Sequence, residues 1–157
     1  MLSVISKSPQ ETSYIGERMA KYLSPGDFIS LTGDLGAGKT LFAQGIARGL
    51  GIEDHITSPT FTIIHEYNEG RLPLYHMDVY RVNGVQDMEN LGYEEYFYGQ
   101  GVSLVEWANL ISEIIPPEHL RLDFKVVPEG REITFYPQGR YYERLVEELT
   151  GHAYSGN

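Results

Sequence analysis

The sequence predicts an α/β fold of three layers, in which a mostly parallel central sheet lies between helices and also carries an antiparallel hairpin. Three observations predict it. The expected elements run helix, strand, loop, helix, and then strands mixed with short helices. A glycine-rich stretch joins one expected strand directly to a helix, and a strand–turn–strand pattern follows later in the chain. The 157 residues suit one domain, expected to span residues 1–150 with a flexible tail at 151–157.

The first expected helix begins with a capping box, in which Ser8 caps the first turn and Glu11 reaches back to it. Apolar side chains follow at helical spacing as far as Leu23, and the turn sequence SPGD at 24–27 ends the helix. The next segment, FISLT at 28–32, predicts a short strand that leads directly into the glycine-rich stretch.

The glycine-rich stretch is followed by an expected helix at 39–51, because apolar residues recur on one face and Gly51 is a helix stop signal. Beyond it, the pattern indicates short strands and short helices separated by turns. The expected elements are a loop leading into a strand at 57–67, a strand at 72–80, short helices within 84–98, a strand at 101–107, a brief helix at 108–115, a hairpin of 120–127 and 131–137, and a closing helix at 139–149.

The stretch GDLGAGKT matches the pattern G-x-x-x-x-G-K-[ST], known as Walker A. Glycines let the backbone wrap tightly, so that its N–H groups surround a phosphate, and the following helix adds its positive N-terminal end. Lys39 supplies a cation for the outer phosphates, and the Thr40 hydroxyl can ligate Mg²⁺. We therefore expect a P-loop NTPase-like fold that binds a nucleotide through Gly33, Asp34, Leu35, Gly36, Ala37, Gly38, Lys39 and Thr40.

Two acidic residues follow apolar runs that are typical of strands. Asp78 ends LPLYHMD, and Glu106 ends VSLVE. In open α/β sheets ligands bind at the carboxyl ends of the strands, so either carboxylate can face the metal or the attacking water, and the pattern leaves both possibilities open.

A second group of polar residues has no assignment from the pattern alone. Thr60 in SPTFT either approaches the phosphates and metal or only starts a strand. We interpret His65 and His76, which lie on expected strands, as packed or surface residues rather than catalytic ones.

Composition narrows the classes of partner. The formal net charge is −10, with four lysines and eight arginines, so binding to DNA or autonomous binding to RNA is not expected. If RNA is involved, a partner should hold it. No apolar run is long enough to cross a membrane, no signal peptide is apparent, and cysteine is absent, so we expect a cytoplasmic protein.

Four motifs in this order and spacing, GDLGAGKT, SPTFT, LYHMDVYR and LVEW, together resemble the bacterial TsaE (YjeE-type) family. That family comprises small P-loop ATPases required for the threonylcarbamoyladenosine modification of tRNA. The resemblance covers nearly the whole chain, from the first helix to the hairpin after Pro117, and none of the main motifs departs from it.

The resemblance implies roles for individual residues. Residues 33–40 would hold ATP or ADP, Thr40 and Glu106 would ligate Mg²⁺, and Asp78 would be an acid essential for hydrolysis, so Lys39, Asp78 and Glu106 form the expected catalytic set. The residues that would lie near the nucleotide are Thr60, in a switch-like loop, Trp107 and Arg131. Ser8, at the start of the first helix, would border the base.

The resemblance also implies partners, namely a complex of TsaB-type and TsaD-type proteins, through which tRNA would be reached only indirectly. The expected activity is ATP hydrolysis that sustains turnover of this complex, and it should be slow without partners because no arginine finger can be named. The alternatives are a P-loop small-molecule kinase, for which no arginine-rich lid is present, a GTP switch, for which the NKxD motif is absent, and a nucleotide-gated adaptor that barely hydrolyses.

Overall fold

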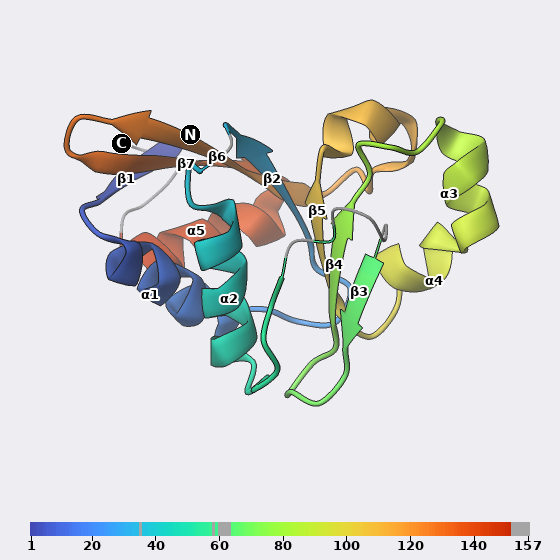
Figure 1. The fold of residues 1–157 in the computed structure, drawn as a ribbon, viewed down its shortest axis with the longest axis horizontal. Coiled ribbons are helices and arrows are strands. Elements are labelled where there is room, and N and C mark those ends of the chain that lie inside the picture. The colour runs from blue at the N-terminus through green and yellow to red at the C-terminus, as the bar shows by residue number, and fades with distance from the viewer. Residues whose placement is uncertain (35, 58, 60–63, 152–157) are drawn as a thin grey trace.

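The computed structural model describes residues 1–34, 36–57, 59 and 64–151, and one mixed sheet runs through it (Figure 1). The strands are β1 (Leu2–Ser6), β2 (Phe28–Gly33), β3 (Ile64–Tyr67), β4 (Leu74–Asp78), β5 (Val102–Glu106), β6 (His119–Val127) and β7 (Gly130–Gln138). The helices are α1 (Pro9–Ala20), α2 (Lys39–Gly49), α3 (Val85–Leu91), α4 (Tyr93–Phe97), the 3₁₀ helix η1 (Ala108–Ile114) and α5 (Arg140–Thr150).

The strand order across the described sheet is β1-β7-β6-β2-β5-β4-β3. The four central strands β6, β2, β5 and β4 are parallel, whereas β1–β7, β7–β6 and β4–β3 pair antiparallel. The sheet is therefore mixed with a parallel centre, and the expectation of a mostly parallel sheet is too strong. Short turns can join only antiparallel neighbours, and the chain uses them in the β6–β7 hairpin and between β3 and β4.

Both faces of the central sheet are covered. Successive side chains of β2 point to opposite faces, and the first four of them are all buried. Ile29 and Leu31 belong to one hydrophobic cluster, which includes side chains of α1, α2 and α5. Phe28 belongs to a second cluster, which includes side chains of α3, α4 and η1. Helices therefore pack on both faces of the sheet. In Figure 1, α1, α2 and α5 lie together toward the left, and α3 and α4 lie at the right.

Local sequence signals account for most element boundaries. The predicted Ser8 cap is confirmed, since the Glu11 N–H donates to Ser8 Oγ over 3.1 Å. The Glu11 carboxylate reaches one residue further back than a capping box predicts, and it accepts from the Lys7 N–H instead of the Ser8 N–H. The hairpin and the two short helices α3 and α4 also lie where the pattern predicts them. The segment at 108–115 forms the 3₁₀ helix η1, whose backbone is kinked at Ile111.

Strand β1 is absent from the sequence-based prediction. Its five residues pair with β7 in register from Leu2 opposite Phe135 to Ser6 opposite Arg131. Val4 and Ile5 favour a strand, but the segment is short and stands next to a strong helix start, and pairing with the edge of β7 completes the strand. Residues 152–157 lie outside the described part of the chain, so the flexible tail expected at 151–157 remains a prediction.

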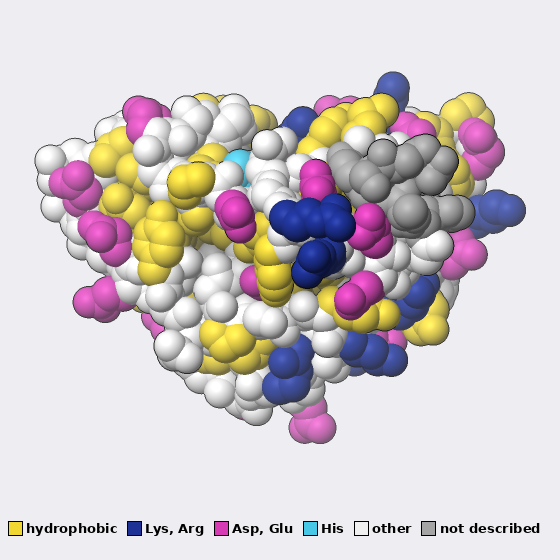
Figure 2. Space-filling view, turned by 180° about the vertical axis from the view of Figure 1, so that it is seen from behind, with side chains coloured by type: hydrophobic (Ala, Val, Ile, Leu, Met, Phe, Trp, Pro, Cys, Tyr) yellow, Lys and Arg dark blue, Asp and Glu magenta, His cyan; other side chains and the backbone are white. Residues whose placement is uncertain are grey.

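Charges of both signs are interspersed on the face seen in Figure 2, where a group of Lys and Arg side chains near the centre has Asp and Glu side chains beside it. Large apolar side chains are also exposed, among them Tyr80, Tyr98, Trp107 and Leu110. Among the residues that the structure describes, no helix has the length and apolar character needed to span a bilayer.

Candidate functional site

The glycine-rich loop lies between the central strand β2 and the start of α2, as predicted. Its backbone needs glycine at defined positions: Gly33 has φ +135° and Gly38, which caps α2, has φ +107°. A methyl group on Gly33 would lie 2.3 Å from the carbonyl oxygen of Phe124 on β6, so this position also requires close backbone approach. The loop is therefore anchored to the sheet at its first glycine.

The two candidate carboxylates meet at the carboxyl ends of adjacent parallel strands. Asp78 on β4 and Glu106 on β5 are register partners. Leu74 of β4 and Leu104 of β5 belong to the cluster that contains α2, so the alternate residues Asp78 and Glu106 lie on that same face, toward the glycine-rich loop. The strand-end placement expected for both acids is confirmed.

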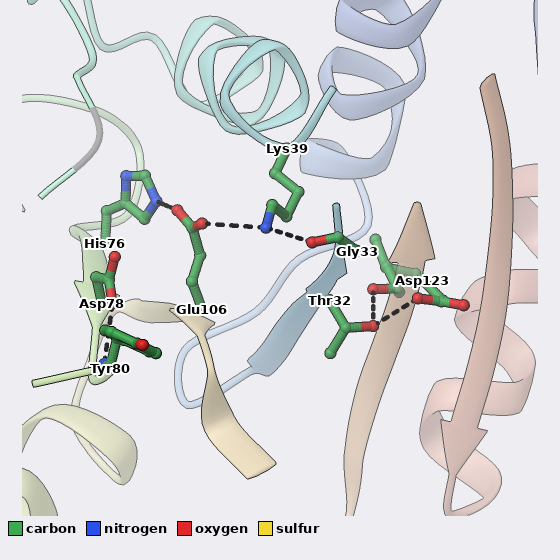
Figure 3. Close-up of polar contacts among 9 residues, drawn as sticks. Thr32, Gly33, Lys39, His76, Asp78, Tyr80, Glu106 and Asp123 are labelled. Carbon is green, nitrogen blue, oxygen red and sulfur yellow. Dashed lines mark hydrogen bonds and ion pairs between the residues drawn. The ribbon is translucent and has the colours of Figure 1, made fainter. Parts of the chain in front are cut away.

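Lys39, the first residue of α2, lies between the loop and Glu106 (Figure 3). Its Nζ donates to the Gly33 carbonyl oxygen over 2.7 Å and lies 3.8 Å from Glu106 Oε1. The same Nζ is 6.0 Å from the centre of the Trp107 ring, within range of a cation–π contact. The lysine is thus oriented toward the carboxylates by contacts on three sides.

Glu106 makes a further contact that the sequence does not predict. Its Oε2 lies 3.0 Å from Nε2 of His76, and both side chains are buried, with His76 completely inaccessible (Figure 3). The interpretation of His76 as a packed residue is right about burial but misses this hydrogen bond. A signal was available in hindsight: His76 stands two residues before Asp78 and hence shares its face.

Asp78 is half-buried, and its Oδ1 accepts a hydrogen bond of 3.0 Å from the Tyr80 N–H. Burial raises the pKa of the Asp78 carboxyl above its ordinary value, and the negative charge of Glu106 contributes in the same direction. The hydrogen bond from Tyr80 and the nearby Lys39 oppose this shift in pKa. The two acids therefore differ in their contacts: the Glu106 carboxylate lies beside Lys39 and His76, whereas the Asp78 carboxylate accepts from the Tyr80 N–H.

A cavity of about 500 Å³ lies between the loop and the strand ends. It brings together most of the predicted site residues, which are Gly33, Asp34, Gly36, Gly38, Lys39, Thr40, Asp78, Glu106 and Trp107, together with Leu41. Trp107 has φ +66°, which is unusual for a residue other than glycine, and its ring packs against Tyr80 with centroids 4.8 Å apart. Backbone strain of this kind gathers at functional sites.

The remaining predicted residues lie elsewhere or outside the described part of the chain. Ala37 is fully buried in the hydrophobic core and does not line the main cavity. Arg131 lines a second cavity, of about 120 Å³, together with Ser8 and Thr12. Gly36, Gly38 and Leu41 line both cavities, so the two cavities adjoin along the glycine-rich loop. Leu35 and Thr60 fall among the residues that are not described.

The oxygen donors at the main cavity fit a hard divalent cation. Thr40 contributes a hydroxyl, and Asp78 and Glu106 contribute carboxylates. The described residues include no group of three or more His, Cys, Asp or Glu side chains that could hold a metal on its own. Mg²⁺ needs only one or two protein oxygens when water and phosphate oxygens complete its shell, so the donor set suits Mg²⁺ bound together with a phosphate compound.

These features define a class: α/β proteins with a Walker A sequence between a central parallel strand and a helix, and with acidic residues at the ends of the adjacent strands. The family of the chain follows from comparison. The sequence profile described as "Threonylcarbamoyl adenosine biosynthesis protein TsaE" matches residues 6–133. The chain belongs to the TsaE family, as the four motifs predict.

Individual relatives agree with this assignment. The tRNA threonylcarbamoyladenosine biosynthesis protein TsaE of Bacillus subtilis (strain 168) is 55% identical over 146 residues, which is 92% of this chain and 91% of that protein. The protein of the same name from Treponema pallidum (strain Nichols) is 43% identical over 131 residues, 83% of this chain and 96% of that protein. The crystal structure of Bacillus subtilis YdiB superposes with a TM-score of 0.84 at 51% identity, and covers 96% of this chain and 95% of its own.

Proposed function

We propose that this TsaE-family chain serves the threonylcarbamoyladenosine modification of tRNA by binding ATP or ADP with Mg²⁺ and hydrolysing ATP. One observation carries the proposal: a lysine, two carboxylates and a glycine-rich loop converge on a single cavity of about 500 Å³. Lys39, Asp78 and Glu106 come from three different elements, and each stands at the end of its element nearest the loop. Such convergence favours a phosphate and metal site over a structural turn.

The phosphates would lie in the main cavity. The N-terminal end of α2 offers unpaired N–H groups and a positive dipole there. Lys39 now donates to the Gly33 carbonyl oxygen, and a phosphate oxygen is the stronger acceptor because it is charged. We propose that Lys39 exchanges this carbonyl for the outer phosphates when the nucleotide binds.

The second cavity would take the base end of the nucleotide. It continues from the main cavity along Gly36, Gly38 and Leu41, and its far wall includes Ser8 and Arg131. This continuity supports the placement of Ser8 near the base and of Arg131 near the nucleotide, although both are remote from the carboxylates. A nucleotide could therefore extend along the glycine-rich loop, with its phosphates and its base at opposite ends.

In ATP hydrolysis, Glu106 and Asp78 would have different roles. We propose that Thr40 and Glu106 hold Mg²⁺, which supplies positive charge for the phosphate oxygens when bound. Asp78 would orient the attacking water and receive its proton, because burial raises the pKa of its carboxyl above the ordinary value and so favours proton uptake. Lys39 and the loop N–H groups would stabilise the charge that spreads over the transferred phosphoryl group.

The partners in this proposal are a TsaB–TsaD-type complex. The net charge of −10 and the acidic side chains beside the basic group in Figure 2 argue that this chain does not hold tRNA by itself. The test is to measure ATP consumption with and without the purified TsaB–TsaD pair. We expect slow hydrolysis by the chain alone and faster hydrolysis with the pair, and no increase for Lys39→Ala. Equal rates of ATP hydrolysis with and without the TsaB–TsaD pair would contradict the coupling.

A further inference from the structure

We propose that His76 is a positioning residue that fixes the carboxylate of Glu106 through its Nε2–H, so that Glu106 faces the cavity rather than collapsing onto Lys39. The inference rests on the proposed function, because it assigns a role to the group that holds a proposed metal ligand. It follows from strand register, burial and contact distances of residues that the structure describes.

Strand register makes the contact a diagonal one. On β4, Leu74, His76 and Asp78 share one face, and His76 is the register partner of Leu104 on β5. Glu106, two residues further along β5, is therefore the diagonal neighbour of His76, within reach of a long side chain. The imidazole points toward the Glu106 carboxylate, which lies between it and the Lys39 ammonium (Figure 3).

The burial of His76 is unfavourable unless the contact compensates for it. The side chain has no accessible surface, and its strand neighbours on this face, Leu74 and Leu104, belong to the hydrophobic core. A carboxylate only accepts, so Nε2 carries the proton that is shared with Glu106 Oε2 over 3.0 Å. Within the described part of the chain, Nδ1 has no hydrogen-bond partner, and a buried unpaired polar atom costs about 1–3 kcal/mol. An apolar residue would avoid that cost.

The contact controls where Glu106 points. Its second oxygen, Oε1, lies 3.8 Å from Lys39 Nζ, longer than a hydrogen bond. Without the anchor on Oε2, the carboxylate is free to rotate toward the lysine and form a closer ion pair, which would withdraw both groups from the cavity. With the anchor in place, Lys39 stays on the Gly33 carbonyl and Oε1 faces the site. Partners of this kind typically change metal affinity about 10- to 100-fold.

Substitutions can separate hydrogen bonding from packing. In His76→Gln, the amide nitrogen can occupy the place of Nε2 and still donate to Glu106. In His76→Phe, the ring is retained but the donor is lost, and in His76→Asn the amide is too short to reach. The matched control is His65→Gln, because His65 is the register partner of His76 on β3 and contacts the Tyr67 hydroxyl at 3.3 Å instead of a carboxylate.

The deciding measurement is the affinity for Mn²⁺ in the presence of ADP, followed by electron paramagnetic resonance, with metal-free ADP affinity measured by calorimetry. We expect wild type, His76→Gln and His65→Gln to bind Mn²⁺ alike, and His76→Phe and His76→Asn to bind it about 10- to 100-fold more weakly. Metal-free ADP affinity should stay within about twofold of wild type for His76→Gln and His65→Gln, and it should fall for His76→Phe and His76→Asn because Glu106 then draws Lys39 away from the phosphates. Should His76→Phe fail to fold, His76→Asn against His76→Gln gives the same comparison.

A readout without metal or nucleotide completes the test. Long-range ¹H–¹⁵N correlation spectra of the nucleotide-free protein should show His76 as the tautomer with the proton on Nε2, and a proton on Nδ1 alone would overturn the inference. If wild type binds Mn²⁺ with ADP and His76→Phe binds it equally well, only the role of His76 is overturned. If wild type itself binds neither Mn²⁺ nor ADP, the proposed function is refuted, and so is the role of His76.

Discussion

Gly33→Ala adds one methyl group and removes no polar atom, and it should both destabilise the protein and damage the loop. Two costs combine. A residue other than glycine at φ +135° costs about 1–3 kcal/mol. The new methyl would also lie 2.3 Å from the Phe124 carbonyl oxygen, and because that atom is backbone, β2 and β6 must separate, at about 1–3 kcal/mol. Together these predict a loss of roughly 2–6 kcal/mol of unfolding free energy.

The assay is thermal unfolding followed by circular dichroism. For a chain of this length, each kcal/mol lowers Tm by about 2–4 °C, so Gly33→Ala should lose at least about 4 °C. The control is Gly36→Ala, where φ is +80° but no described atom lies within 4 Å of the added methyl, so only the backbone cost applies. Nucleotide affinity should also fall more for Gly33→Ala, since its carbonyl orients Lys39. Equal Tm values for the two variants would refute the close-approach argument.

Three further outcomes are expected. Asp78→Asn should keep the hydrogen bond from the Tyr80 N–H and nucleotide affinity, yet lower the ATP turnover number about 10²- to 10⁴-fold in a phosphate-release assay; unchanged turnover would contradict its role. Tyr142→Phe should cost about 1–3 kcal/mol in urea unfolding, because the buried N–H of Phe28 loses its acceptor, and a loss near zero would mean that water replaces it. Burial raises the pKa of Asp27, so its contribution to stability is present below about pH 4 and is lost as pH rises through the folded-state pKa. Asp27→Asn should therefore gain stability relative to wild type as pH rises above about pH 4, and a pH-independent difference would contradict this.

Local patterns predict the loop and its flanking elements well, because each signal there is contained in a few consecutive residues. The Walker A sequence, the apolar run before it and the amphipathic segment after it define β2, the loop and α2 without reference to the rest of the chain. The position of Asp78 and Glu106 at strand ends follows from apolar runs that stop at an acid. Their convergence then follows from the general geometry of parallel sheets.

Contacts that depend on register escape such patterns. The bond between His76 and Glu106 exists because β4 and β5 pair with His76 opposite Leu104, and no local signal specifies that pairing. The separation of Arg131 from the carboxylates has the same cause, since it depends on the order of β7 and β6 in the sheet. Strand β1 likewise depends on the edge that β7 offers, because its five residues are too few to predict a strand by themselves.

The most direct test of the whole account is isothermal calorimetry of ATP with Mg²⁺ on wild type and on Lys39→Ala. Lys125→Ala is the matched control, because Lys125 is exposed on β6 and lines neither loop cavity. We predict that wild type and Lys125→Ala bind alike and that Lys39→Ala binds at least about tenfold more weakly, as loss of a charged hydrogen bond to phosphate implies. Equal affinity of wild type and Lys39→Ala would contradict the placement of the phosphates on this loop.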